Sequence, residues 1–165
     1  MAWLDAGPAA TSGSSYLIIP ARSEERVTAN VARHTVTEHR DGVETQRSGD
    51  IFTELRARWT PPSGVTATAQ FTGGWVGWFG YECAATTLDI SVATESDAYP
   101  DAAWFRAGAW ARFEHDRGTL AIDGCDESAI AHLTAALDAP ASPSSGPRGV
   151  VARWRDEPNH YAHQV

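Results

Sequence analysis

The segment from Phe71 to Glu82 constrains the fold of this chain more than any other stretch. It reads FTGGWVGWFGYE, so glycines are interleaved with aromatic residues. Aromatic residues favour β-strands, whereas glycine weakens a strand unless another backbone or a ligand must come very close. Alternation along a strand would place one set of residues on a common face, namely Trp75, Gly77, Phe79 and Tyr81. The segment therefore predicts a strand that is crowded on both faces and needs a close-fitting neighbour.

The composition is that of one folded, acidic domain. A chain of 165 residues, of which 42% are apolar and seven are tryptophan, can bury a sizeable core. The net charge is −8, and all 13 basic residues are arginines. This balance argues against a nucleic-acid partner, because phosphate binding needs a basic face. The chain does not open with a basic segment followed by an apolar run, so we expect a cytoplasmic protein without a membrane role.

Candidate metal and catalytic residues are sparse. Cys83 and Cys125 lack a C-x-x-C spacing and are expected to be two reduced thiols. His160 and His163 could share one side of a helix, but no third zinc ligand lies near them in the sequence. The other histidines are scattered and expected to be solvated: His34, His39, His115 and His132. The glycines match neither a dinucleotide-binding nor a P-loop spacing. No catalytic residue and no metal site is therefore predicted.

Hydrophobic alternation predicts strands in the first third of the chain, at residues 2–5, 15–19, 27–31 and 43–47. Val36 is out of phase with the strand before it, which leaves either a bulge near residues 32–34 or two separate strands. The dipeptide 41–42 is Asp-Gly and predicts a tight turn. Asp50 is expected to be the N-cap of a helix whose apolar residues reach Trp59.

The second half of the chain predicts a hairpin made of residues 104–113 and 119–122. Asp126 is expected to cap a helix that runs to Leu137. Residues 83–97 are low in hydrophobicity and predict an exposed loop. Together these elements predict the α+β class, with a mostly antiparallel β-sheet and two or three helices.

The C-terminal residues have a different character. Residues 139–149 have the composition of a flexible linker. Asp156, with Pro158 just inside, would open another helix, but the sequence ends at Val165, barely two turns later. A helix that short is not stable by itself. We therefore expect the sequence to be the front part of a longer protein.

The glycine segment resembles the GGxxGxxGY(D/E) signature of the N-terminal region of aminodeoxychorismate synthase component I and anthranilate synthase component I. Further segments are similar to this family in the same order along the chain: Trp3-Leu4-Asp5-Ala6, Ser15-Tyr16-Leu17-Ile18-Ile19, Tyr99 to Trp104, and Asp156 to Val165. The opening tryptophan and the glycine–tryptophan-rich motif look more like aminodeoxychorismate synthase than like anthranilate synthase.

The resemblance implies a domain organisation. Residues 1–138 would form an N-terminal domain like that of anthranilate synthase component I, 139–149 a linker, and 150–165 the truncated start of the chorismate-binding catalytic domain. The sheet would be part of a larger α/β/β/α sandwich. The whole enzyme would convert chorismate, with ammonia from a glutamine amidotransferase partner, to 4-amino-4-deoxychorismate for folate and 4-aminobenzoate biosynthesis. The Mg²⁺ site would lie in the catalytic half, so no cofactor is expected in this segment and no catalytic residue can be assigned to it.

The resemblance also implies two sites. A packing motif would face the catalytic half and consists of Gly73, Gly74, Gly77, Gly80, Tyr81 and Glu82. Leu4, Asp5 and Ala6 correspond to a strand that lines a tryptophan pocket in the family. Ala6 replaces a serine, and a lost polar partner weakens such a site by about 1–3 kcal/mol, so tight tryptophan binding is not expected. Three alternatives stay open: a fragment of anthranilate synthase component I of tryptophan biosynthesis, a stand-alone tryptophan-binding regulatory module, and a non-functional gene fragment.

Overall fold

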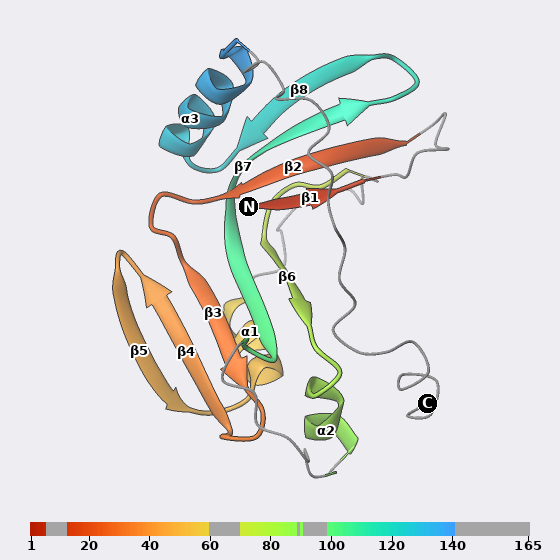
Figure 1. Cartoon of the computed structure of the whole chain (residues 1–165). Coiled ribbons are helices and arrows are strands. Elements are labelled where there is room, and N and C mark those ends of the chain that lie inside the picture. The colour runs from red at the N-terminus through yellow and green to blue at the C-terminus, as the bar shows by residue number, and fades with distance from the viewer. Residues whose placement is uncertain (6–12, 60–69, 89, 91–98, 141–165) are drawn as a thin grey trace, which may run out of the picture.

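The structure is a computed structural model that describes residues 1–5, 13–59, 70–88, 90 and 99–140. These residues form an antiparallel sheet and three helices, which confirms the α+β class (Figure 1). The elements in chain order are β1 (Ala2–Leu4), β2 (Ser14–Pro20), β3 (Arg26–Asn30), β4 (Thr35–Arg40), β5 (Val43–Ser48), α1 (Ile51–Arg58), β6 (Trp75–Phe79), α2 (Cys83–Leu88), β7 (Ala102–Glu114), β8 (Thr119–Gly124) and α3 (Glu127–Asp138). The predicted linker and the start of a further domain, at residues 141–165, lie outside the described residues.

The long strand β7 joins two parts of the sheet. Its first half pairs with β3 and β6, and its second half pairs with β2 and β8. Figure 1 shows β7 running through both parts and bending between them. Between the two halves, the pairing of β7 with β2 shifts register at Gly108, since Ile19 pairs with Ala109 and Pro20 with Ala107. The Gly108 carbonyl oxygen accepts from the backbone N–H groups of Cys125 at 2.9 Å and Asp126 at 3.1 Å. The whole domain is therefore organised around β7. The sequence predicts this strand over residues 104–113, and the structure shows it slightly longer at each end.

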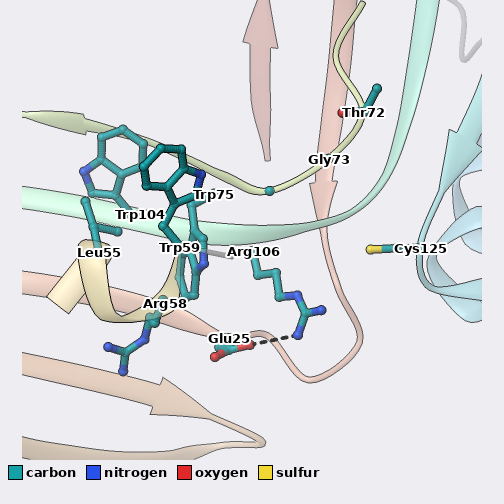
Figure 2. A pocket seen from close by; sticks show the side chains of 11 residues that line it. Glu25, Leu55, Arg58, Trp59, Thr72, Gly73, Trp75, Trp104, Arg106 and Cys125 are labelled. Carbon is teal, nitrogen blue, oxygen red and sulfur yellow. Dashed lines mark ion pairs between the residues drawn. The ribbon is translucent and has the colours of Figure 1, made fainter. Parts of the chain in front are cut away.

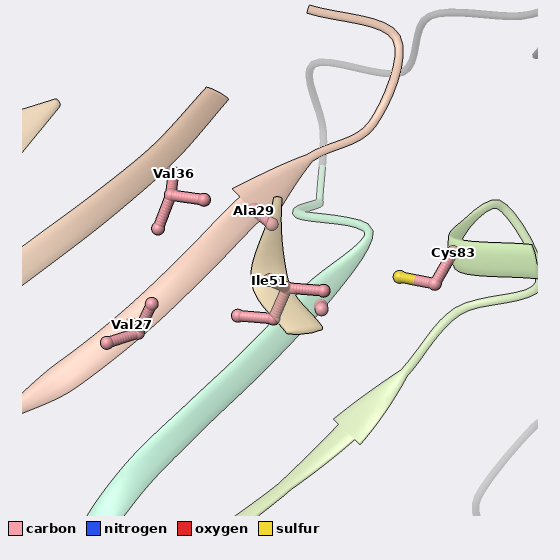
Figure 3. Packing of buried hydrophobic residues seen from close by; sticks show 6 residues of the cluster. Val27, Ala29, Val36, Ile51 and Cys83 are labelled. Atoms are coloured by element: carbon pink, nitrogen blue, oxygen red, sulfur yellow. The ribbon is translucent and has the colours of Figure 1, made fainter. Parts of the chain in front are cut away.

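One core lies between α1 and the part of the sheet made of β3, β4, β6 and β7. Val27, Val36 and Ile51 are fully buried there, and Cys83 packs beside them (Figure 3). Apolar alternation in β3 and β4 places these valines on one face, toward the helix. The amphipathic stripe of α1 supplies Ile51, so helix and strands bury each other's apolar sides.

Two more clusters lie along the second half of β7. Ala109 and Ala111 pack under α3 against Leu133, which is 2% exposed. Trp110 alternates with these alanines and so faces the other side of the strand, where it packs with Ile18 and meets Phe71 edge-on at a centroid distance of 5.0 Å. The small alanines allow the helix to approach the strand closely, whereas the large tryptophan fills the opposite side.

Local sequence signals give several correct predictions. Asp50 caps α1 by accepting from the Thr53 N–H at 2.9 Å, and Asp126 caps α3. The out-of-phase Val36 marks two separate strands, because His34 has a φ of 50° and turns the chain between β3 and β4. The predicted turn before β5 is also present, with positive φ at both of its central residues.

The prediction of an exposed loop over 83–97 is wrong at its start. Residues 83–88 form α2, and Cys83 is 2% exposed, with its thiol donating to the Asp101 carbonyl at 3.2 Å. Burial raises the pKa of this thiol. Two threonines and a length of six residues give α2 little helical tendency of its own. Its formation therefore depends on docking the cysteine into the core, which local sequence does not reveal.

An ion-pair cluster ties α1 to the sheet. Glu54 of α1 accepts from Arg47 of β5, with Nε to Oε1 at 3.1 Å, and from Arg58 one turn further along the helix. Glu38 of β4 pairs with the same two arginines, at 2.9 Å from Arg58 and 3.4 Å from Arg47. These four side chains thus form a network of two positive and two negative groups.

This network predicts an acid-sensitive contribution to stability. Burial alone would raise the pKa of Glu54, but hydrogen bonds from Arg47 and Arg58 outweigh it and lower the pKa. A lowered folded-state pKa stabilises the fold above the ordinary glutamate value of about 4.3, and this stabilisation is lost as the pH falls through the folded-state pKa. We expect Glu54→Gln to flatten the acid side of the curve of unfolding free energy against pH, measured by urea denaturation. Glu127→Gln, at an exposed site, should leave the curve unchanged, and a Glu54→Gln curve as steep as that of the unsubstituted chain would contradict the prediction.

Candidate functional site

The glycine–aromatic segment forms an edge of the described sheet. Gly73 and Gly74 have φ of 103° and 114° and lead into β6, which pairs with β7 as its one partner strand among the described residues. Figure 1 shows β6 on the side of β7 opposite to β3. The predicted alternation holds over β6 itself but ends at Phe79, so Tyr81 lies beyond the strand.

The glycines of this segment have close neighbours within the chain. A methyl group on Gly77 would lie 2.1 Å from the Ala103 carbonyl oxygen and 2.6 Å from Trp104 Cα. The Gly80 N–H donates to the Asp101 carbonyl at 2.7 Å, and a methyl group there would lie 2.9 Å from the same oxygen. These two glycines let β6 lie tightly against β7. Their role toward another domain stays a prediction.

The aromatic side chains at the end of the segment lie in solvent. Phe79 stacks on Phe52 of α1 at a centroid distance of 5.0 Å, yet it is 43% exposed. Trp78 is 47% exposed on the other face of β6, and Tyr81 is 97% exposed with Glu82 exposed beside it. We call Trp78, Phe79 and Tyr81 the aromatic end. Trp78 and Phe79 lie on opposite faces of β6, so the aromatic end presents large apolar side chains on both sides of the strand.

The strand that resembles a tryptophan-pocket strand is described as far as Asp5. Leu4 is 47% exposed at the end of β1. An Asp5 carboxylate oxygen accepts from the Ser15 hydroxyl at 2.7 Å, and the same hydroxyl oxygen lies 2.7 Å from His115 Nε2. Ala6 lies outside the described residues. The Asp5 carboxylate is therefore already engaged by a buried serine rather than held open for a ligand.

His115 corrects the prediction that it is solvated. Pairing of β2 with β7 brings it beside Ser15, although a hundred residues separate them in sequence. The serine donates its one proton to Asp5, so the histidine donates to the serine oxygen. A nucleophilic serine must instead give its proton to histidine, and Ser15 is 2% exposed. This cluster joins the ends of β1, β2 and β7, and its buried serine is not arranged as a nucleophile.

A pocket of about 660 Å³ lies where the glycine segment begins, and sequence reasoning missed it. Figure 2 shows Trp59, Trp75 and Trp104 on one side of it, with Glu25 and Arg106 facing the same space. The residues that line the pocket are spread between positions 25 and 125, so no local sequence motif indicates the pocket. The pocket does not include the Leu4–Asp5 strand.

Other site classes find little support in the described residues. No group of three or more potential metal ligands occurs within residues 1–5, 13–59, 70–88, 90 and 99–140. Cys83 is a buried free cysteine and Cys125 an exposed one. None of the described helices has the length and hydrophobicity needed to cross a membrane.

Comparison with known proteins finds similarity among solved structures. No protein-family model matches the sequence, and no curated protein sequence matches it. Among solved structures, the fold is similar to anthranilate synthase component I from Streptococcus pneumoniae TIGR4, with a TM-score of 0.57 and 17% sequence identity. The match covers 84% of this chain and 32% of that chain, and it falls on the N-terminal part of the larger protein. The chain thus has the fold of the N-terminal part of that anthranilate synthase component I and spans about a third of its length.

Proposed function

We propose that this chain is the N-terminal, non-catalytic portion of a component I enzyme, and that the enzyme is an aminodeoxychorismate synthase. The observation that carries the proposal is the fold similarity, which covers most of this chain but only 32% of the similar protein. The order of the family-like segments along the sequence agrees with it. The choice of aminodeoxychorismate synthase over anthranilate synthase rests on the opening Trp3 and on the tryptophan-rich glycine motif.

The proposed role is that of a scaffold for the catalytic half. The aromatic end offers apolar side chains to a further layer of protein. The edge of β6 that does not pair with β7 offers backbone groups to the same layer. In the proposed enzyme this layer belongs to the chorismate-binding half, which would also hold Mg²⁺, and the glutamine amidotransferase would bind the assembled component. Chorismate and ammonia would then react entirely outside the present segment.

Binding to a catalytic half in trans tests this role. We expect the chain alone to form no product from chorismate, ammonia and Mg²⁺, and to self-associate through its uncovered apolar surface. We expect it to bind the isolated catalytic half of an aminodeoxychorismate synthase more tightly than that of an anthranilate synthase. The double variant Trp78→Ser/Tyr81→Ser should weaken this binding at least tenfold, or about 1.4 kcal/mol, measured by calorimetry.

The control for this experiment is Leu120→Ser, which removes an apolar side chain that is 53% exposed on β8, away from the aromatic end. It should leave the affinity unchanged. Product formation by the chain alone would overturn the non-catalytic role. Binding to neither catalytic half, or equal affinity of the double variant and the parent, would overturn the docking role.

The regulatory-module alternative is tested with tryptophan. We expect no tryptophan binding that depends on Asp5, because Ser15 already donates to its carboxylate and Ala6 lacks a hydroxyl. Calorimetric heat at millimolar tryptophan that Asp5→Asn abolishes would favour the regulatory module instead.

A further inference from the structure

We propose that the pocket between the end of α1, the start of β6 and the middle of β7 binds a small planar aromatic carboxylate. Its volume of about 660 Å³ lies within the range of about 300–1,000 Å³ that is usual for small-molecule sites. The aromatic end and the Leu4–Asp5 strand do not line the pocket, but Gly73, Gly74 and Trp75 of the same glycine–aromatic segment do.

The apolar part of the site is a group of three indole rings from three separate elements. Trp59 follows α1, Trp75 opens β6 and Trp104 belongs to β7, and Figure 2 shows the three rings gathered on one side of the pocket. Trp59 is 70% exposed. The exposed Trp59 ring, beside two half-buried indole rings, leaves a flat aromatic surface uncovered. A planar aromatic ligand can stack on this surface.

The charged part of the site is built around the buried Glu25 carboxylate. Glu25 is 7% exposed, and its Oε2 lies 3.5 Å from Arg106 and 3.7 Å from Arg40. Two guanidinium groups therefore share one carboxylate, in a chain whose net charge is −8. Of these two guanidinium groups, Arg106 lines the pocket and Arg40 does not.

Arg106 is the group that can bind the carboxylate. Its side chain is 53% exposed and faces the pocket in Figure 2. Within the described part of the chain, the 3.5 Å ion pair to Glu25 is the one polar contact of the Arg106 side chain, and the Glu25 Oε2 makes no hydrogen bond. The N–H donors of the guanidinium are thus available for two parallel hydrogen bonds to a ligand carboxylate.

Arg58, the other cation that lines the pocket, is already held in ion pairs. Arg58 pairs with Glu38 and Glu54, and its guanidinium lies 5.9 Å from the Trp75 ring centroid. It holds the indole wall in place and leaves Arg106 as the anion-binding group. A ligand that has an aromatic body and one carboxylate uses both parts of the site, whereas inorganic phosphate would leave the indole rings uncovered.

Calorimetry on the full 165-residue chain tests the proposal with 2-naphthoate and its neutral analogue naphthalene-2-carboxamide as probes. We expect saturable binding of 2-naphthoate, and binding of the carboxamide that is at least tenfold weaker. Arg106→Gln and Trp59→Ala should each weaken 2-naphthoate binding at least tenfold. Both residues are exposed, and circular dichroism checks that each variant is folded.

Matched controls separate this pocket from the rest of the surface. Arg117→Gln removes a guanidinium whose side chain is 72% exposed, and Trp3→Ala removes an indole that is 61% exposed, both outside the pocket. Neither should change the affinity. The proposal is overturned by the absence of saturable binding at millimolar 2-naphthoate, by equal affinity for the carboxamide, or by unchanged affinity in either pocket variant.

Discussion

Replacing Gly77 by alanine is expected to destabilise the domain by about 3 kcal/mol or more. The added methyl group would lie 2.1 Å from the Ala103 carbonyl oxygen and 2.6 Å from Trp104 Cα. Both are backbone atoms of β7, so no side chain can rotate away to make room. Relief requires β6 to separate from β7, which breaks the pairing that extends from Trp75 to Phe79.

Urea denaturation measures this effect, and Gly118→Ala is the control. A methyl group on Gly118 meets no atom within 4 Å, but φ is +61° there, so the control carries a backbone strain of about 1 kcal/mol. A loss for Gly77→Ala that is no larger than the loss for Gly118→Ala would show that the two strands are not packed as tightly as described.

Gly108→Ala is expected to have a comparable effect for a different structural reason. A methyl group at this position would lie 2.4 Å from Ala21 Cα and 2.8 Å from the Pro20 carbonyl oxygen, where the chain leaving β2 crosses the bend of β7. The Gly108 carbonyl also accepts from the two N–H groups that lead into α3. A shift of the bend would therefore disturb both the crossing and the start of α3, and we expect a loss of about 3 kcal/mol or more.

Hydrogen exchange locates this effect as well as measuring it. Faster exchange is expected first in the backbone amides of α3 and of the second half of β7. Gly42→Ala serves as the comparison, because φ is +78° there with no atom within 4 Å of the added methyl group. Uniform acceleration over all strands, or a stability loss below that of Gly42→Ala, would contradict the proposed role of the bend.

Much of the fold could be predicted from local sequence because its signals are local. The N-caps Asp50 and Asp126 and the turn before β5 depend on side chains within a few residues of the backbone groups they satisfy. The alternation in β3 and β4 depends on one buried and one solvated face. Helix α2 could not be predicted in this way, since its stability comes from burying Cys83 in a core built by distant residues.

For the candidate sites, too, local features could be predicted from the sequence and long-range contacts could not. The sequence singles out the glycine segment, and the structure gives Gly77 and Gly80 close neighbours in the same chain while leaving Trp78 and Tyr81 in solvent. The sequence gives no sign that Ser15 donates to Asp5, because only strand pairing brings β1, β2 and the end of β7 together.

By itself, the sequence determined most strands, turns and helix caps, because these follow from side-chain shape and from apolar periodicity within a few residues. Only the tertiary structure decided that β7 serves both parts of the sheet and that three tryptophans and Arg106 line one pocket. The physical reason is that such pairings depend on which surfaces meet when the whole domain buries its apolar faces, and that choice is made over distances of up to a hundred residues along the chain.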